Sequence, residues 1–332
     1  MPESEKNGVD LVAIGGGTGL STLLSGLKKY VGVGIGGTAV RRLSAIVAVS
    51  DDGGSSGRLR DEFQMPPPGD IRNCMVALSE DSNLLSKLFR YRFSGDGDLS
   101  GHNFGNLFLA ALSEVTGDFA EAVRLSSEIL ASKGHIFPAT VSDVRIAARL
   151  TDGSIVQGET NISKTGGTIE RLYLEPEDCK PHPEAIAAID TADILTIGPG
   201  SLFTSILPPL LVNGVVDAIA ASTATKIFIC NLMTQPGETD GLTARRHLEI
   251  VREYAPGLDF DYVIVNNRPI SEIQKQLYTR DGAEQIGVHG SIDAEKIEGA
   301  DVVYRNLLDD GELVRHHSGR LARTVMDLQM AQ

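Results

Sequence analysis

A glycine turn near the start of the chain carries the first residues that could bind a phosphate. The apolar segment Val9–Ile14 runs into Gly15-Gly-Gly-Thr-Gly19, and an apolar-periodic helix is predicted from Leu20 onward. Glycines let the backbone approach a phosphate, and the free N–H groups and positive dipole end of a helix attract its charge. The turn departs from both standard phosphate loops. The dinucleotide fingerprint needs glycine where Leu20 stands, and no lysine follows as in a P-loop. The predicted phosphate-binding residues are Gly15, Gly16, Gly17, Thr18 and Gly19.

A second glycine turn repeats this order further along the chain. The apolar segment Ile194–Ile197 is followed by Gly198-Pro-Gly-Ser201 and then by a helical pattern over Leu202–Val212. The turn is not G-x-S-x-G, so it does not indicate a nucleophile elbow. Two such turns favour a diphosphate, or two phosphorylated groups, over a single phosphate. Gly198, Gly200 and Ser201 are the phosphate-binding residues predicted here.

An acidic pair, Asp51 and Asp52, follows the apolar segment Leu43–Val49. The carboxyl ends of parallel strands line the ligand crevice of open α/β sheets, so we expect this pair to lie near the first glycine turn. Two carboxylates could bind Mg²⁺ between phosphates, or contact a sugar hydroxyl. The alternative is an acidic turn that only closes the strand, since Asp and Gly are common there.

Two further polar stretches precede predicted helices. Arg72 could hold a phosphate or carboxylate through its planar guanidinium, and Asp70 is expected to cap its helix. In His102-Asn-Phe-Gly-Asn106, the amides of Asn103 and Asn106 are predicted phosphate contacts. His102 is a general base only if the protein is an enzyme, because a lone histidine is more often structural.

The elements that must position these residues alternate between β-rich apolar segments and helical patterns, which predicts a Rossmann-like α/β fold with a mostly parallel sheet and helices on both faces. The predicted strands of the sheet are Val9–Ile14, Leu43–Val49, Ile194–Ile197, Lys226–Cys230 and Tyr262–Val265. Val144–Leu150 and Ile155–Glu159 flank an Asp-Gly turn and predict an antiparallel hairpin. We expect one domain over 9–332, with this hairpin in an insertion at about 138–180 and a flexible terminus over 1–8.

Composition excludes several classes of partner. The 332 residues carry a formal net charge of −14, and the aromatic content is 5%, which disfavours nucleic acid. The longest apolar run, Ile206–Val212, is too short to insert into a membrane. Three scattered cysteines, Cys74, Cys179 and Cys230, fit a reducing compartment and indicate no zinc site. We therefore expect a cytoplasmic protein that binds neither nucleic acid nor membrane.

Five ordered motifs resemble a known family. They are Gly15-Gly-Gly-Thr-Gly-Leu-Ser21, Val49-Ser-Asp-Asp-Gly-Gly-Ser-Ser-Gly-Arg58, Pro68-Gly-Asp-Ile-Arg72, His102-Asn-Phe-Gly-Asn106 and Gly198-Pro-Gly-Ser-Leu-Phe-Thr-Ser205. Over about Leu11 to Leu321 the chain resembles the bacterial gluconeogenesis factor (YvcK-like) proteins, which are related to 2-phospho-L-lactate transferase. The resemblance implies a Rossmann-like fold and a site for UDP-N-acetylglucosamine or an NAD-type dinucleotide. It also implies a role in cell shape and cell-wall precursor balance during gluconeogenic growth.

The resemblance also assigns residues by position. Tyr278 and Arg315 match contacts to a nucleotide sugar, and Asp51 and Asp52 match the metal- and substrate-binding pair of the transferase branch. Arg72 is a further predicted substrate or sugar contact. The loop Asn231–Gly241 is predicted on the same rim, as a lid or sugar-binding loop. His316 and His317, beside Arg315, lack acidic or cysteine partners at metal-binding spacing, so we expect a solvated loop there.

Three functions are weighed. The favoured one is a regulator that binds a nucleotide sugar and acts on protein partners in cell-wall synthesis, with no assigned catalytic residue and with a homo-oligomer as an open alternative. The second is a metal-dependent phospholactyl transferase, in which Asp51 and Asp52 hold Mg²⁺ and Arg72 neutralises developing charge. The third, an NAD-dependent oxidoreductase, is disfavoured by Leu20 in the fingerprint.

Overall fold

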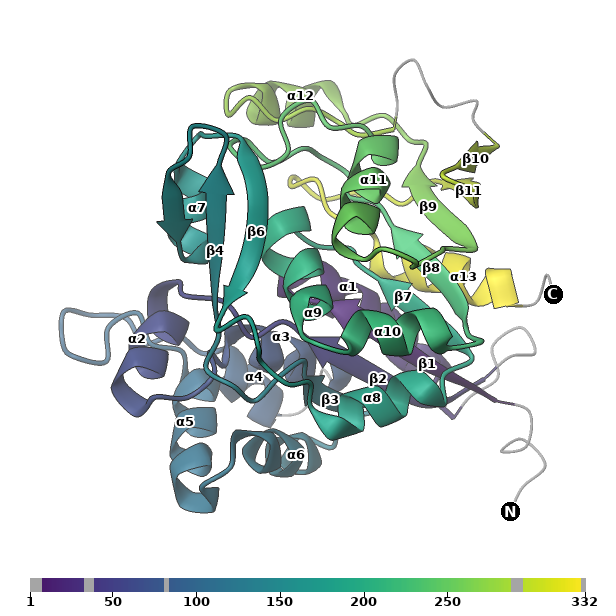
Figure 1. Cartoon of the computed structure of the whole chain (residues 1–332). Coiled ribbons are helices and arrows are strands. Elements are labelled where there is room, and N and C mark those ends of the chain that lie inside the picture. The colour runs from purple at the N-terminus through teal and green to yellow at the C-terminus, as the bar shows by residue number, and fades with distance from the viewer. Residues whose placement is uncertain (1–7, 33–38, 81–83, 288–294, 330–332) are drawn as a thin grey trace.

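The computed structural model describes residues 8–32, 39–80, 84–287 and 295–329 (Figure 1). The predicted flexible terminus, apart from Gly8, lies outside these residues. An eight-stranded sheet runs through the described part of the chain in the order β10-β11-β9-β8-β7-β1-β2-β3, and only the β10–β11 pair is antiparallel. Its strands are β1 (Val9–Gly15), β2 (Val40–Val47), β3 (His135–Pro138), β7 (Ile194–Ile197), β8 (Thr225–Ile229), β9 (Tyr262–Asn266), β10 (Lys296–Ile297) and β11 (Ala300–Arg305). The predicted α/β class is confirmed.

Helices cover both faces of this sheet (Figure 1). Contacts of α1 with α3 and α13 join these three helices, while α8, α9 and α10 form a second connected group. The described α-helices are α1 (Gly17–Leu27), α2 (Gly54–Phe63), α3 (Gly69–Leu78), α4 (Leu84–Arg90), α5 (Phe104–Thr116), α6 (Phe119–Ile129), α7 (Glu159–Lys164), α8 (Pro183–Asp190), α9 (Leu207–Leu211), α10 (Val215–Ala221), α11 (Ala244–Tyr254), α12 (Glu272–Thr279) and α13 (Ser318–Gln329).

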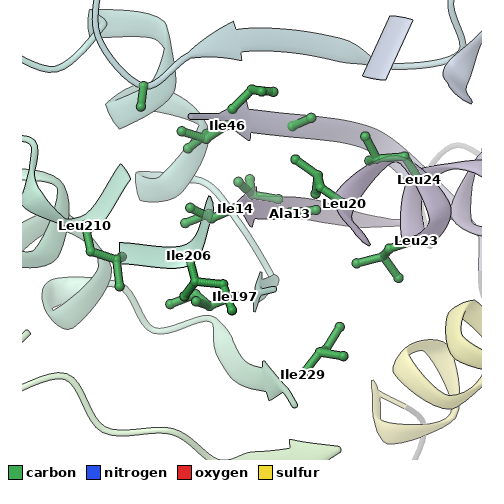
Figure 2. Packing of buried hydrophobic residues seen from close by; sticks show 14 of the residues in the cluster. Ala13, Ile14, Leu20, Leu23, Leu24, Ile46, Ile197, Ile206, Leu210 and Ile229 are labelled. Atoms are coloured by element: carbon green, nitrogen blue, oxygen red, sulfur yellow. The ribbon is translucent and has the colours of Figure 1, made fainter. Parts of the chain in front are cut away.

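The core forms where α1 meets the centre of the sheet. All seven residues of β1 are buried, as a strand covered on both faces requires. Leu20, Leu23 and Leu24 of α1 are fully buried beside the sheet, at the 3–4 residue spacing of an amphipathic helix (Figure 2). This packing holds the start of α1, and therefore the first glycine turn, against the carboxyl end of β1.

The predicted hairpin exists and is part of a second, smaller sheet. Its strands are β4 (Arg145–Leu150), β5 (Ile155–Gln157) and β6 (Ile169–Glu175), in the antiparallel order β5-β4-β6, and α7 connects β5 to β6. The Tyr254 hydroxyl of α11 accepts a hydrogen bond from the backbone N–H of Leu172 in β6, at 2.7 Å. The insertion is thereby bonded to the main body of the fold.

One predicted helix differs in form. Instead of a continuous α-helix over Leu202–Val212, the chain forms a π-helix over Leu202–Ile206 and then the short α9. Pro208 and Pro209 lack the backbone N–H groups that would bond the preceding turn, so regular α-helical pairing cannot continue through them. Among the described residues no single helix is long and apolar enough to cross a membrane, and only the bent pair Leu202–Leu211 with Val215–Ala221 meets the length and composition criterion together.

The order of the strands defines where a ligand can enter. The chain passes from β1 to β2 on one side, and later returns to β7 on the other side of β1. The loops that leave the carboxyl ends of β1 and β7 therefore diverge at a topological switch point, which is the usual ligand crevice of an open α/β sheet. Both glycine turns lie there.

At the opposite, amino-terminal end of β1, Asp10 forms a buried ion-pair cluster. Its side chain is only 4% exposed, and it accepts hydrogen bonds from Arg41 Nε at 2.8 Å and Arg42 Nε at 3.0 Å. Burial alone would raise the pKa of Asp10, but the two arginines outweigh it and hold the pKa below its ordinary value.

We expect Asp10→Asn to lower stability at pH 7 by about 1–2 kcal/mol, because both arginines are half exposed and the pair is partly screened. A carboxyl with a lowered folded-state pKa stabilises the protein above its ordinary pKa, and this contribution is lost as the pH falls through the folded-state value. The difference between Asp10→Asn and wild type should therefore shrink below about pH 4 in denaturant titrations. Asp327→Asn, on the exposed side of α13, is the control and should show no such trend.

Candidate functional site

The two glycine turns pack directly against each other. A Cβ atom on Gly19 would overlap the carbonyl oxygen of Pro199, and one on Gly200 would lie 3.0 Å from Ser205 Cβ and 3.4 Å from Gly16 O. Gly17 has φ = +63°, in the left-handed region that other residues rarely adopt. Glycine is therefore required for the contact between the turns as well as for their backbone shape.

A cavity of about 480 Å³ opens at this contact. Its walls come from Gly16–Gly19, Gly200–Ser201, the 231–236 loop after β8 and the 314–316 loop before α13. Glu159 of α7 and Tyr278 of α12 also line the cavity. The volume lies within the usual range for small-molecule sites. Of the predicted site residues, this cavity brings together Gly16, Gly17, Thr18, Gly19, Gly200, Ser201, Tyr278 and Arg315.

Two larger hollows lie elsewhere in the described residues. One, of about 910 Å³, lies between α11, α12 and β9, and the other, of about 630 Å³, lies beside α6 and α8 and reaches the amino-terminal half of β1. The larger hollow adjoins the candidate cavity through Thr234 and Ala283, and Thr234 and Gly241 of the predicted 231–241 loop line it; no glycine-turn residue, Tyr278 or Arg315 lines either hollow. We place the candidate site in the smaller cavity because only there do both glycine turns contribute, at the switch point of the sheet.

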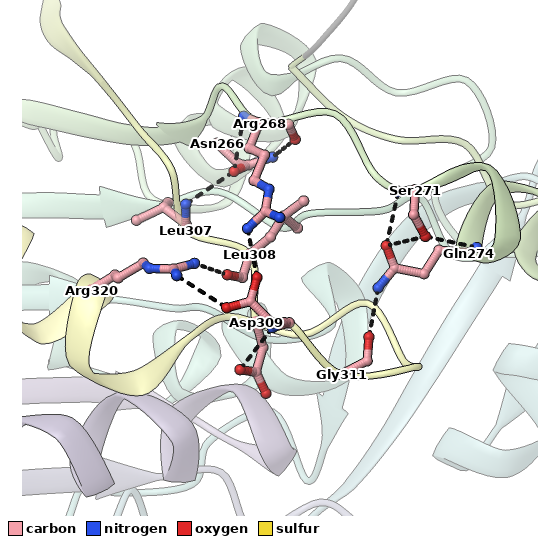
Figure 3. A network of polar contacts seen from close by, with 10 residues as sticks. Asn266, Arg268, Ser271, Gln274, Leu307, Leu308, Asp309, Gly311 and Arg320 are labelled. Atoms are coloured by element: carbon pink, nitrogen blue, oxygen red, sulfur yellow. Dashed lines mark hydrogen bonds and ion pairs between the residues drawn. The ribbon is translucent and has the colours of Figure 1, made fainter.

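The loop that carries Arg315 is held by contacts to three elements (Figure 3). Asn266 Oδ1, at the end of β9, accepts a hydrogen bond from Leu307 N at 3.1 Å. Gln274 of α12 donates to Gly311 O at 2.8 Å, and Arg320 of α13 donates to Leu308 O. Beyond this network, the Tyr278 hydroxyl accepts from Val314 N at 3.0 Å, which ties the predicted sugar-contacting tyrosine to the loop. Tyr278 and Arg315 are therefore positioned together.

Asp70 does not cap α3, so that expectation is wrong. The helix begins at Gly69 with Pro68 at the N-cap position, and the Asp70 carboxylate instead accepts a hydrogen bond from Gly17 N at 2.7 Å. Burial, and then the charge of Asp51, raise the pKa of Asp70 to about 6. Tertiary contact overrides the local capping preference, because the N–H groups of the first glycine turn need an acceptor.

The predicted acidic pair divides between two roles. Asp52 Oδ1 accepts hydrogen bonds from Thr160 N at 2.9 Å and Thr160 Oγ1 at 2.8 Å, and so holds the start of α7. Asp51 Oδ1 accepts from Gly53 N at 2.8 Å. The charge of Asp51 acts on both Asp70 and Glu159 and raises the pKa of each. Asp52 and Glu238 also raise the pKa of Glu159, so the carboxyl groups that influence one another here are Asp51, Asp52, Asp70, Glu159 and Glu238.

Glu159 is a cavity residue that no sequence motif indicated. It begins α7 inside the insertion, and the fold brings it to the glycine turns through Asp52–Thr160 and through Ser163 Oγ, which donates to Glu238 at 2.5 Å. Burial, and then the charges of Asp51 and Asp70, raise the pKa of Glu159 to about 8. Only the tertiary contact between insertion and body could reveal this residue.

Mg²⁺ remains a prediction for this site. Carboxylate oxygens suit it. Burial and, after it, the repulsion between neighbouring carboxylates raise the pKa values of Asp70 and Glu159, and a cation would relieve the repulsion. Within the described residues, however, no three or more His, Cys, Asp or Glu side chains are arranged to ligate a metal ion. A cation here would therefore need oxygen ligands from water or from the phosphates of a ligand.

We expect Glu159→Gln to stabilise the protein by an amount that grows with pH. A carboxyl with a raised folded-state pKa contributes its full stability below its ordinary pKa of about 4.5 and loses it as the pH rises through about 8. The glutamine variant does not titrate, so its advantage should increase between pH 5 and pH 8 and then level off. Thermal unfolding at pH 5, 7 and 9 measures this. Glu114→Gln, on the exposed surface of α5, should match wild type throughout; the same flat result for Glu159→Gln would contradict the prediction.

His102, Asn103, Asn106 and Arg72 lie outside the cavity. Asn103 caps α5 by accepting a hydrogen bond from Asn106 N, and Ser55 Oγ lies 3.1 Å from His102 Nδ1. Burial lowers the pKa of His102 and, together with the charge of Arg92, that of Arg72. His102, Asn103 and Asn106 form a buried polar network with Ser55 of α2. The Arg72 side chain packs beside Gly105 of α5, and its Nε is buried without a partner among the described residues. The predicted contacts of all four residues with a ligand stay predictions.

The sequence predicts a solvated loop at His316, but the imidazole ring of this residue is largely shielded from solvent, so the expectation is wrong for this side chain. His316 lines the cavity, and its Nε2 is buried without a partner among the described residues. The 231–241 loop also contributes, since Gln235 Nε2 donates to Ser201 Oγ at 2.7 Å and Asn231 Oδ1 accepts from Gly200 N at 3.2 Å. The part of this loop that follows β8 is therefore a wall of the cavity.

The fold and the site define a doubly wound α/β protein with a glycine-lined cavity at its switch point. Comparison with known proteins then places it in a family. The model of the family described as 2-phospho-L-lactate transferase CofD matches residues 11–308. The chain belongs to the gluconeogenesis factor (YvcK-like) group within this family.

Curated relatives support this placement over nearly the whole chain. It is 43% identical to the gluconeogenesis factor of Halalkalibacterium halodurans over 321 residues, covering 96% of each protein. It is 41% identical to the gluconeogenesis factor of Bacillus subtilis, covering 96% of this chain and 97% of the relative. A crystal structure of a UPF0052 family protein from Bacillus halodurans superposes with a TM-score of 0.89 at 42% identity, covering 96% of this chain and 99% of that one.

Proposed function

We propose that this protein binds a nucleotide sugar of the UDP-N-acetylglucosamine type in the switch-point cavity. The observation that carries the proposal is the convergence of both glycine turns with Tyr278 and Arg315 on one cavity. The backbone of Gly16–Gly19, at the start of α1, would receive the diphosphate. Arg315 would add a cation, and Tyr278 would contribute a flat apolar surface with a polar tip.

The resemblance to the gluconeogenesis factors supports a biological role for this binding. We infer a cytoplasmic regulator that passes the level of the nucleotide sugar to protein partners in cell-wall synthesis, and so affects cell shape and wall-precursor balance during gluconeogenic growth. An NAD-type dinucleotide is the competing ligand, because its diphosphate would use the same turns. A regulator of this kind is expected to bind its protein partners differently with and without the nucleotide sugar.

Isothermal titration calorimetry of the folded protein with UDP-N-acetylglucosamine tests the binding step. We expect saturable binding in the micromolar range, and a rise in melting temperature with ligand concentration, because a ligand of the folded state stabilises it by mass action. NAD and GDP, each with and without Mg²⁺, are run beside it. No heat from UDP-N-acetylglucosamine at millimolar concentration would rule out the proposal.

We expect Arg315→Ala to weaken this binding about tenfold, because it removes one charge-assisted contact to the diphosphate or sugar. Arg280→Ala is the matched control, since Arg280 follows α12 and lies outside the cavity lining. Titration calorimetry on both variants measures the difference. Equal affinities for the two variants would place the ligand away from Arg315.

A second function is favoured by the carboxyl groups beside the first glycine turn. In a metal-dependent phospholactyl transferase, Asp51 and Asp52 would bind Mg²⁺ together with oxygen ligands from water and from the phosphates of the substrate, and the cation would neutralise charge on those phosphates. The match to the transferase family model supports this alternative. Its test is turnover of a nucleotide-activated phospholactate with a deazaflavin acceptor, abolished in Asp51→Asn.

A further inference from the structure

His316 is held rigidly at the wall of the cavity. Its backbone pairs with Leu308 in an isolated β-bridge, and on either side Arg315 O accepts from Asp309 N at 2.8 Å while His317 N donates to Leu307 O at 2.7 Å. The loop is in turn bonded to α12 through Gly311 and to α13 through Leu308 (Figure 3). The backbone at His316 is therefore fixed beside Arg315 at the cavity wall.

The protonation state of this ring follows from its surroundings. Burial lowers the pKa of His316 to about 4, and a hydrogen bond with the backbone of Cys230 opposes this shift only partly. The ring is therefore neutral at pH 7. The hydrogen bond with Cys230 raises the pKa of the ring, so in this bond a ring N–H donates to the Cys230 carbonyl. Nε2 has no partner among the described residues, so the nitrogen that donates is the other one. In the neutral ring one nitrogen donates and the other accepts, so Nε2 is the acceptor.

A second polar group, on another wall of the same cavity, is also incompletely hydrogen-bonded. The Gln235 amide bonds Ser201 Oγ through one end, and its other end is buried without a partner in the described structure. A buried polar atom without a hydrogen-bond partner lowers stability, so such atoms in folded proteins usually have a partner. Both atoms belong to residues that line one cavity, which makes the occupant of that cavity the natural partner.

We propose that His316 determines ligand specificity by accepting, at Nε2, a hydrogen bond from an uncharged donor of the ligand, either a sugar hydroxyl or a base N–H. Phosphate oxygens only accept hydrogen bonds at neutral pH and cannot supply this donor. The glycine turns and Arg315 bind the diphosphate, while His316 forms a hydrogen bond with the uncharged part of the ligand. This inference rests on the proposed function and adds the residue that recognises the sugar or base.

The test compares wild type with His316→Phe, which keeps a ring but removes the acceptor. We expect His316→Phe to bind UDP-N-acetylglucosamine about ten- to hundredfold more weakly in titration calorimetry. His182→Phe is the matched control. His182 also has a buried ring nitrogen without a partner among the described residues, but it lies beside the edge strand β3, in another hollow. The His182→Phe variant should bind UDP-N-acetylglucosamine with the affinity of wild type.

Ligand analogues identify the donor. They are 2′-deoxyribose, 3′-deoxyribose and N3-methyluracil forms of the UDP-sugar, and forms that lack single hydroxyls of the hexose. One of these should bind wild type more weakly by a factor similar to the His316→Phe loss, and should lose nothing further in the variant. A lost ribose or hexose hydroxyl and a blocked base N–H distinguish the two sources. If every analogue loses the same factor of affinity in His316→Phe as in wild type, the inference is overturned.

A second variant separates recognition from packing. His316→Gln places an amide oxygen near the position of Nε2 and should bind more tightly than His316→Phe. If the two variants lose affinity equally, His316 has a packing role and the inference fails. Wild type that binds no UDP-sugar overturns the proposed function and this inference together, whereas normal affinity in His316→Phe overturns only this inference.

Discussion

Gly19→Ala is expected to reduce the affinity for UDP-N-acetylglucosamine at least a hundredfold and to lower stability by about 2–3 kcal/mol. A methyl group on Gly19 would overlap the carbonyl of Pro199, which is backbone and cannot rotate away. The two glycine turns would have to separate, and the N–H groups of the first turn would no longer face the same cavity as Gly200 and Ser201.

The control for this prediction is Gly97→Ala, because a methyl group at Gly97 would meet no atom within 4 Å. Its melting temperature and affinity should match those of wild type. Melting is measured first, so that affinities are compared at a temperature where both variants are folded. Gly19→Ala that folds and binds normally would show that the contact between the turns is unnecessary for binding.

Asp143→Ala is expected to destabilise the protein by about 3 kcal/mol, more than Arg60→Met does. The Arg60 side chain on α2 is 1% exposed and is paired with Asp143, just before β4. Its Nη2 also donates to Val144 O at 2.6 Å, while Nε and Nη1 have no partner among the described residues. Burial lowers the pKa of Arg60, and the charge of Asp143 opposes that shift. Removal of Asp143 therefore leaves a buried guanidinium without its ion-pair partner.

Arg60→Met removes the buried charge itself and keeps much of the side-chain volume, so its cost should be about 1 kcal/mol, mainly from the unpaired Val144 carbonyl. Asp61→Ala is the matched control, because its ion pair with Arg145 joins the same elements but both partners are exposed. We expect at most about 0.5 kcal/mol from it. Urea denaturation gives all three values, and a larger loss in Arg60→Met than in Asp143→Ala would contradict this account.

The Arg60 cluster has a consequence for the site. Together with the bond from Leu172 to Tyr254, it fixes the insertion to the main body, and α7 of the insertion carries Glu159 to the first glycine turn. Asp143→Ala should therefore also weaken ligand binding at temperatures where the fold persists. The reason is that α7, which carries the cavity residue Glu159, is held to the main body partly by the Arg60–Asp143 ion pair, which lies outside the cavity.

The α/β class was predictable because buried parallel strands and amphipathic helices have strong local patterns. The strand ends at Ile14 and Ile197 and the hairpin around Asp152 were correct within one or two residues. Strand β3, at the edge of the sheet, and the strands β10 and β11 near the other edge were not predicted. These strands are short or partly exposed, so they lack the continuous apolar runs of the central strands.

Within the site, the sequence by itself determined the two glycine turns and their place after buried strands, because backbone shape and strand–turn–helix order are local properties. The tertiary structure alone decided which polar side chains face the cavity. It turned Asp70 to Gly17 instead of its own helix, turned Asp52 to Thr160, and brought Glu159 and His316 to the cavity wall. Such choices depend on which buried N–H groups and charges need partners across distant segments, and no local pattern carries that information.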